Sequence, residues 1–507
     1  MKRFCIILTA TLLALSCSSP EQGCREMEGL VLQSGLLGRE VPYSVVLPEK
    51  YFSEPARSYP VLYMFHCIGG DASTGIEYCD ITHTLDSLVR TKEVEPMIVV
   101  MPDVFLSYCS DAFDGSFPYE KMLLEELIPE VEKTWRTDGR RSTIGFSMGG
   151  FGAMSVALRH PDLFCATAGL SPSVRTDAQY ASEEPQEGWE SQWGRIFGGM
   201  GETGEARITP YYKERCPLHL LEDLPAETLS DMGIFIATGN REGGSLAESN
   251  EALHLALLGR GIPHVFSVSD GGHDFAFWRK HLSDALRYLS CRMNGKPYSA
   301  KITAEPSRSR DFPAPENIGD ARLYMPETGF VTTRKFPYIC VFGASGEQEK
   351  DIMEYYAAQL RRGGATPIAF LFADKDFEAA LKGVEENAPQ LRHSQRMRSA
   401  ICFGKASGEL QGLMMKENLF TNVVFVEAEG TVPAEEFAEA IKAQRRYPRI
   451  ILAGIADSPA YKEQAGLHAA LKNAGASHFH YAYETGSGDP LRHFPEWLET
   501  INYKFHD

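Results

Sequence analysis

Ser142-Thr143-Ile144-Gly145-Phe146-Ser147-Met148-Gly149-Gly150-Phe151-Gly152-Ala153 is the stretch that decides the fold. It predicts the end of a buried strand, a sharp turn and the start of a helix. Residues 145–149 fit G-x-S-x-G, the pattern of a strained turn that presents a nucleophilic serine. The glycines leave room for that turn and for close packing of the helix. The helix N-terminus also favours negative charge that develops beside Ser147 during acyl transfer.

Two apolar runs before this turn and two after it predict strands. They cover residues 60–65, 97–101, 234–238 and 265–268, and residues 36–47 predict a hairpin. Apolar residues at helical spacing predict helices over residues 119–135 and 246–258 and a final helix ending near residue 288. Strands that alternate with helices indicate a mostly parallel, doubly wound sheet of the α/β class.

Three residue types of acyl-transfer chemistry follow predicted strands in the order Ser147, Glu242, His273. We expect His273 to be the general base and Glu242 to orient it and to stabilise the imidazolium. Asp231 or Asp223 is the alternative acid. Beside the base, Asp274 is expected to cap a helix rather than to react.

An oxyanion hole requires two backbone N–H groups near the nucleophile. One is expected from Met148, directly after Ser147. The other is expected from the turn at Cys67-Ile68, and Ile68 is the preferred donor.

Several linked motifs resemble the putative-esterase family: His66 to Gly70, Gly145 to Gly150, and Gly271 to Phe275 with Trp278. That family includes feruloyl esterases, S-formylglutathione hydrolases and mycolyltransferases. The resemblance covers residues 28–293 and implies an α/β-hydrolase fold, an ester substrate and no cofactor. Two departures stand out, because the family commonly has glycine in place of Cys67 and aspartate in place of Glu242. From their positions, His66, Cys67 and Trp278 are expected to contact substrate.

Residues 171–229 interrupt the strand–helix alternation and are rich in Glu, Gly, Pro and aromatic residues. A long insertion in such a sheet commonly forms a cap over the strand ends, where ligands bind. Trp189 and Trp193 are therefore candidate substrate contacts. The alternative is that these aromatic side chains pack the insertion's own small core.

The second half of the chain repeats the pattern of the first. After a Pro- and Ser-rich linker over residues 294–335, residues 336–346 parallel 59–69, and residues 398–406 parallel 141–149. Gly404 then stands at the position of Ser147, and no histidine stands at the position of the base. Residues 336–507 are therefore predicted to form a degenerate, non-catalytic α/β-hydrolase-like domain. An unrelated α/β domain with similar periodicity is the alternative.

The N-terminus predicts export. Lys2 and Arg3 precede an apolar run over residues 4–15 that is too short to span a bilayer but typical of a signal peptide. The run ends at Cys17, in a setting similar to the lipobox of bacterial lipoproteins. We expect a signal peptide over residues 1–16, lipidation of Cys17, a tether over residues 17–27 and anchoring to the bacterial envelope, periplasmic or at the cell surface. Ordinary secretion with cleavage nearby is the alternative.

Composition bounds the remaining possibilities. The 507 residues predict two domains, and 43% hydrophobic with 23% charged residues is typical of globular proteins. A net charge of −18 argues against nucleic acid as a partner. No Cys or His spacing is typical of zinc, so no metal is expected. Four cysteines are expected to be buried thiols: Cys67, Cys165, Cys340 and Cys402. Five others could form disulfides whose pairing the sequence does not define: Cys24, Cys79, Cys109, Cys216 and Cys291.

The sequence therefore favours a serine carboxylesterase that works through an acyl-enzyme. The family resemblance implies acyl groups on polysaccharide, of feruloyl or acetyl type. Two alternatives remain open: an acyltransferase with the same triad, and a surface binding lipoprotein that retains a hydrolase shell.

Overall fold

The computed structural model describes residues 23–243, 246–299, 314–326, 335–361, 368–393, 398–430, 432–444, 448–486 and 488–505. The predicted signal peptide and Cys17 lie outside these residues. We call residues 23–299 the first half and residues 314–505 the second half.

The strands of the first half lie in the order β1-β2-β4-β3-β5-β6-β7-β8. β1 and β2 form an antiparallel hairpin, β2 pairs antiparallel with β4, and the remaining pairs are parallel. This arrangement confirms the predicted mostly parallel α/β-hydrolase fold. The strand bounds are β1 (Arg25–Ser34), β2 (Arg39–Leu47), β3 (Tyr59–Phe65), β4 (Ile98–Pro102), β5 (Thr137–Phe146), β6 (Ala166–Leu170), β7 (Gly233–Gly239) and β8 (Val265–Ser269).

Helices cover both faces of this sheet. Alternate residues of β3 point to opposite faces, so Tyr63 packs with α4, α5 and α12, whereas Leu62 packs with α2 and α13. Burial on both faces explains why β3 is apolar throughout. The helices outside the insertion are α1 (Thr74–Glu77), α2 (Ile81–Arg90), α3 (Tyr119–Met122), η1 (Leu123–Leu127), α4 (Ile128–Thr134), α5 (Met148–Arg159), α12 (Leu246–Gly259) and α13 (Phe275–Met293).

The insertion between β6 and β7 is a set of short helices whose aromatic side chains join the core of the first half, where Trp193 packs against Tyr108 and Phe151. Tyr180, Trp189, Trp193, Phe197 and Tyr212 are all buried in it. Its helices are α6 (Asp177–Ser182), α7 (Gln186–Trp189), η2 (Glu190–Gly194), α8 (Arg195–Phe197), η3 (Gly204–Arg207), α9 (Pro210–Lys213), α10 (Pro217–Asp223) and α11 (Ala226–Asp231).

The second half repeats the strand order of the first. Its strands lie in the order β9-β10-β12-β11-β13-β14-β15-β16, with β9 and β10 antiparallel at the outer edge and parallel pairs from β12 onward. The strand bounds are β9 (Glu316–Ile318), β10 (Ala321–Tyr324), β11 (Tyr338–Phe342), β12 (Ala369–Ala373), β13 (Arg398–Phe403), β14 (Asn422–Val426), β15 (Arg449–Ile455) and β16 (His478–Tyr483).

Helices also flank both faces of the second-half strands. Two apolar clusters contain the opposite faces, one with α15 to α18 and the other with α14 and α19. None of the helices in the described residues is both long and apolar enough to cross a membrane. The helix bounds are α14 (Gly346–Arg361), α15 (Phe377–Asn387), α16 (Ala406–Lys416), α17 (Ala434–Ala443), α18 (Tyr461–Asn473), η5 (Pro490–His493) and α19 (Phe494–Phe505).

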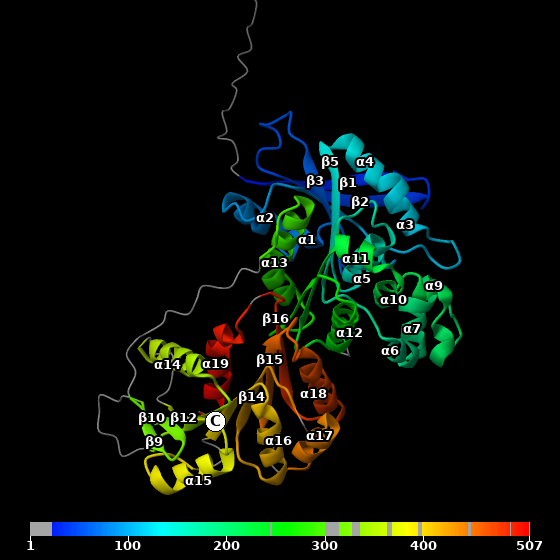
Figure 1. The fold of residues 1–507 in the computed structure, drawn as a ribbon. Helices are drawn as coiled ribbons and strands as arrows, with labels where there is room; N and C mark the ends of the chain where they lie inside the picture. Colours follow the sequence, from blue (N-terminus) through cyan, green and yellow to red (C-terminus); the bar gives the residue numbers. More distant parts are fainter. Residues whose placement is uncertain are drawn as a thin grey trace, which may run out of the picture.

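The two halves join edge to edge into one sheet. Val268 of β8 pairs antiparallel with Ala482 of β16. Figure 1 shows the first half (blue to green) above the second (yellow to red), with β16 between them and α12 and α18 on the same side of the junction. Across it, Tyr461 donates to Glu251, Thr485 donates to the His264 carbonyl, and Lys472 pairs with Glu248.

Two predicted boundaries are corrected by the strands. The expected linker over residues 294–335 is too long, because residues 316–324 form β9 and β10 at the edge of the sheet. These strands are short and charged, so their sequence lacks the apolar run by which buried strands are recognised. The expected tether over residues 17–27 overlaps β1, which begins at Arg25.

Candidate active site

Ser147 lies in the strained turn that its sequence predicts. Its φ of 52° and ψ of −115° are unusual for a residue with a side chain, and it precedes α5 at the end of β5. A Cβ atom at Gly145 would lie 2.1 Å from the Gly149 carbonyl oxygen, and one at Gly149 would lie 2.2 Å from the Phe65 carbonyl oxygen. Glycine is therefore required at both positions for the turn to fit against β3.

The structure brings Ser147, His273 and Glu242 together from three strand ends. His273 Nε2 lies 2.8 Å from Ser147 Oγ, and His273 Nδ1 lies 2.6 Å from Glu242 Oε2. Since a carboxylate only accepts, Nδ1 carries the proton and Nε2 is free to accept one from the serine hydroxyl. Glu242, rather than Asp223 or Asp231, is the acid that contacts His273. Asp274 caps α13 by accepting from Phe277 N–H, as predicted.

Glu242 is held by donors that sequence patterns did not reveal. Its side chain is fully buried, and Oε1 accepts from Gly239 N–H at 3.1 Å and from the Ser171 hydroxyl. Ser171 in turn accepts from Trp278 Nε1 at 3.1 Å. This network fixes the carboxylate so that Oε2 faces His273. Ser171 directly follows β6, and its position at a strand end beside the triad strands is the signal that would have found it.

The turn after β3 orients a backbone N–H group. His66 Nε2 accepts from Val104 N–H at 2.8 Å, so Nδ1 carries the proton and donates to the Cys67 carbonyl at 2.7 Å. Gly70 N–H donates to the same carbonyl at 3.1 Å. Because N–H and C=O of a trans peptide point in opposite directions, this fixes Ile68 N–H away from the tethered carbonyl. Within the described residues neither Ile68 N–H nor Met148 N–H has a hydrogen-bond acceptor.

The other side chains that were expected to contact substrate are all buried. Trp189 and Trp193 are 1% and 0% exposed in the core of the first half, which contradicts the expectation that they contact substrate. Aromatic composition alone did not show whether these side chains line a substrate site or pack in the core. Trp278 is buried behind the triad, with its ring edge-on to His273 at 5.2 Å between centroids. Cys67 is a buried free thiol whose pKa is raised by burial, and His66 is buried in the turn that it orders.

The nine cysteines of the described residues are all free thiols. Three of the four expected buried thiols, Cys67, Cys340 and Cys402, are buried, and Cys165 is partly exposed. The five cysteines with open pairing form no disulfide here.

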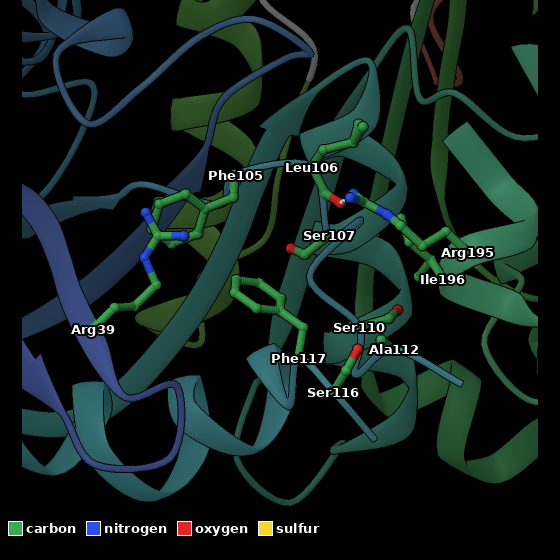
Figure 2. Close-up of a pocket in the computed structure, with 10 residues that line it drawn as sticks. All are labelled: Arg39, Phe105, Leu106, Ser107, Ser110, Ala112, Ser116, Phe117, Arg195 and Ile196. Carbon is green, nitrogen blue, oxygen red and sulfur yellow. Dashed lines mark hydrogen bonds between the residues drawn. The ribbon is translucent and has the colours of Figure 1, made fainter. Parts of the chain in front are cut away.

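A pocket of about 450 Å³ lies between the loop that follows β4 and the insertion (Figure 2). The Arg39 guanidinium lies 4.3 Å from the centre of the Phe105 ring, and Phe117 meets that ring edge-on at 5.7 Å. Arg195 donates to the Leu106 carbonyl at the opposite side. β4 is parallel to the triad strands, so this loop leaves the same edge of the sheet. The remaining lining residues are Ser107, Ser110, Ala112, Ser116 and Ile196.

The pocket loop is hydrogen-bonded to the turn that follows β3. Val104 N–H donates to His66 Nε2, and Asp103, which precedes it, accepts from Phe105 N–H at 2.8 Å. Phe113 N–H donates to the Ile196 carbonyl at 2.8 Å, which joins the loop to the insertion. Hydrogen bonds therefore connect the pocket walls to the turn that carries Ile68.

Comparisons with known proteins find esterases similar to residues 34–289. The sequence model of a family described as "Putative esterase" matches residues 34–289. An esterase of Mycobacterium tuberculosis is 28% identical over 268 residues, 48% of this chain and 54% of that protein. An endo-1,4-beta-xylanase/feruloyl esterase of Xylanibacter ruminicola is 31% identical over 239 residues, 46% of this chain and 26% of that protein. The chain thus spans about half the length of the first relative and about a quarter of the second.

Among solved structures, a ferulic acid esterase aligns with 24% identity and a TM-score of 0.45, over 53% of this chain and 99% of that chain. An S-formylglutathione hydrolase from Agrobacterium tumefaciens aligns with 20% identity and a TM-score of 0.43, over 54% of this chain and 96% of that chain.

Proposed function

This chain belongs to the putative esterase family, and on that premise we propose that it is a serine esterase that forms an acyl-enzyme on Ser147. One observation carries the proposal: the hydrogen-bonded sequence Ser147–His273–Glu242, with Ser147 at a strained turn and a helix N-terminus. Removing any one of these features would leave a hydroxyl that is a weak nucleophile at neutral pH.

The proposed reaction begins when Ser147 Oγ attacks the ester carbonyl carbon and His273 Nε2 takes the hydroxyl proton. Negative charge moves to the carbonyl oxygen, where the N–H groups of Ile68 and Met148 donate to it. Glu242 stabilises the imidazolium, which then gives its proton to the leaving alcohol. A water molecule repeats the attack on the acyl-enzyme, and Ser147 is regenerated.

We propose that the pocket between the loop after β4 and the insertion binds an aromatic acyl group, such as feruloyl, carried on a polysaccharide. Phe105 and Phe117 offer aromatic faces and edges, and Arg39 and Arg195 add polar groups at the rim. The Xylanibacter relative, an endo-1,4-beta-xylanase/feruloyl esterase, supports the same substrate class.

The experiment that tests this proposal is turnover of a panel of esters by the full chain. The panel compares acetyl, butyryl and feruloyl esters of an aryl alcohol and of a sugar. We expect hydrolysis of all activated aryl esters and the highest kcat/KM for the feruloyl series. A preference for acetyl over feruloyl would reject the aromatic substrate, and no turnover of any activated ester would reject the esterase. Transfer of the acyl group to an added alcohol, in preference to water, would identify an acyltransferase.

We propose that the second half contributes no catalytic group. Gly404 N–H donates to the Val426 carbonyl at 2.9 Å, as Ser147 N–H donates to the Leu170 carbonyl at 3.1 Å. Glu427 likewise follows its strand with φ of 51° where Ser171 has φ of 48°. These equivalent contacts support the interpretation that Gly404 replaces the nucleophile. Glycine has no group that accepts an acyl chain.

We also propose that the protein is exported and anchored through Cys17. This proposal rests on the sequence of the first seventeen residues. Metabolic labelling with an alkynyl fatty acid tests it: incorporation is expected in the natural protein and not in Cys17→Ala. Equal incorporation in both would contradict lipidation at this residue.

A further inference from the structure

Three ligating side chains meet where the two halves join. Glu251 comes from α12 of the first half, and His468 and His480 come from α18 and β16 of the second. One ligating atom from each lies within 4.8 Å of the others. We call these three residues the interface cluster.

The interface cluster is short of hydrogen-bond partners for its burial. Glu251 and His480 are 6% and 4% exposed, and the Nε2 atom of His480 is buried without a partner among the described residues. Glu251 Oε1 accepts from the Tyr461 hydroxyl at 2.7 Å and lies 3.7 Å from His480 Nδ1, beyond hydrogen-bond distance. A buried carboxylate and a buried imidazole are costly when they are left so incompletely paired.

Outer hydrogen bonds fix the proton positions of His468. The Ala476 carbonyl accepts from His478 Nδ1 at 2.8 Å, so His478 Nε2 has a free electron pair. That atom lies 2.8 Å from His468 Nδ1, which therefore donates to it. His468 Nε2 is left unprotonated and has no hydrogen-bond partner in the described part of the chain. Histidines that bind metals are commonly oriented in this way, through a bond from the second ring nitrogen.

Burial lowers the pKa of His468 and of His480 to about 3. His468 is partly exposed.

The first half has the same framework without the ligands. His254 and His264 are paired at 2.7 Å with the same ten-residue spacing as His468 and His478, and His264 Nδ1 donates to the Ile262 carbonyl. In this register Phe266 stands for His480, and Ala465 stands for Glu251. The Phe266 ring stacks on His254 at 4.3 Å, and His254 Nε2 lies 2.7 Å from the Ala456 carbonyl. The fold therefore tolerates the apolar residues Phe266 and Ala465 at the positions equivalent to His480 and Glu251.

We propose that Glu251, His468 and His480 bind one divalent transition-metal ion, of the Zn²⁺ class, which joins the two halves. Two imidazoles and one carboxylate are a common zinc ligand set. The His468 and His480 rings stack at 4.5 Å between centroids, so they must rotate before their nitrogens reach the ~2.0–2.2 Å at which zinc binds them. The ligands come from both halves, so the ion stabilises their junction. The sequence predicted no metal because Glu251 and the two histidines are far apart in the chain. This proposal does not depend on the esterase reaction.

The test measures Zn²⁺ bound to the full chain after chelation, dialysis against Zn²⁺ and removal of free ion. We expect about one ion per natural chain and almost none in His480→Phe or Glu251→Ala. These variants carry the residues found at the equivalent positions, Phe266 and Ala465, and are expected to fold. His83→Phe, at an exposed histidine of α2, is the matched control and should retain the ion.

Two further readouts use the natural chain. Saturating Zn²⁺ should raise its thermal unfolding temperature, since the ion binds only the folded state, and should leave that of His480→Phe unchanged. Bound Co²⁺ should give the visible absorption of a low-symmetry nitrogen and oxygen site. The proposal is rejected if the natural chain retains less than about 0.1 ion, or if both cluster variants retain as much as the His83 control. Turnover of an activated ester should be the same with and without Zn²⁺, so failure here leaves the proposed function intact.

Discussion

Ser171 donates its hydroxyl hydrogen to Glu242 Oε1, although the two residues are 71 positions apart in the chain. They follow neighbouring strands, β6 and β7, whose carboxyl ends lie together. The bond holds one carboxylate oxygen so that the other faces His273. Trp278 completes the support by donating to Ser171.

Ser171→Ala should therefore lower kcat by about 10–100-fold, because a hydrogen bond to a charged group contributes about 1.5–3 kcal/mol. KM should change little, since Ser171 supports the acid rather than the substrate. Steady-state kinetics on a short aryl ester measures both. A tenfold rise in KM with kcat unchanged would place Ser171 in substrate binding.

Glu242→Gln should lower the rate by at least roughly a hundredfold, because it removes the charge that balances the imidazolium. Asp223→Asn and Asp231→Asn are the matched controls and should retain the natural rate. A large loss in either control, with a small loss in Glu242→Gln, would move the catalytic acid to that residue.

Phe105→Ala should raise KM for a feruloyl ester by about tenfold, as the loss of one aromatic contact predicts. KM for the corresponding acetyl ester should stay the same, because an acetyl group has no ring for Phe105 to contact. Phe52→Ala removes an exposed phenylalanine that does not line the pocket and serves as the control. An equal change in KM for the feruloyl and acetyl esters would show that the pocket does not bind the acyl group.

Stability should fall as the pH drops below about 6.5, where histidines of the unfolded chain take up protons. Burial lowers the pKa of His281 to about 3, and its Nε2 lies 2.6 Å from Ser269 Oγ. The folded state therefore does not gain that proton, and each pH unit between about 6.5 and 3 favours unfolding by up to about 1.4 kcal/mol for this group.

His281→Gln keeps a polar side chain that does not titrate, so its stability should fall less steeply than that of the natural chain. Denaturant unfolding at several pH values between about 7.5 and 5.5 measures the two slopes. Identical slopes would show that His281 is protonated equally in the folded and unfolded states.

Much of the fold follows from local patterns. β3, β4, β7 and β8 are short apolar runs, and the turn around Ser147 requires glycines that the sequence displays. Ser147 was recognised because it lies in a linear motif. Glu242 and His273 were recognised because they directly follow apolar runs that predict strands.

The missed features depend on contacts between distant residues. Ser171 and the interface cluster are brought together only by the sheet order and by the junction of β8 with β16. Whether Trp189 and Trp193 contact substrate or pack in a core depends on the direction in which each side chain points, and composition does not determine that direction. β9 escaped notice because edge strands tolerate polar residues, and β10 escaped notice because it is only four residues long.

Ser147 is the one serine expected to accept an acyl group, and labelling with a fluorophosphonate probe measures this. Intact mass spectrometry and peptide mapping of the full chain should show one adduct, on Ser147, and Ser147→Ala should show none while its circular dichroism is unchanged. His273→Ala should label much more slowly, since the base no longer takes the serine proton. Adduct formation on Ser345 or Ser407, or ester turnover by Ser147→Ala within tenfold of the natural rate, would contradict the account.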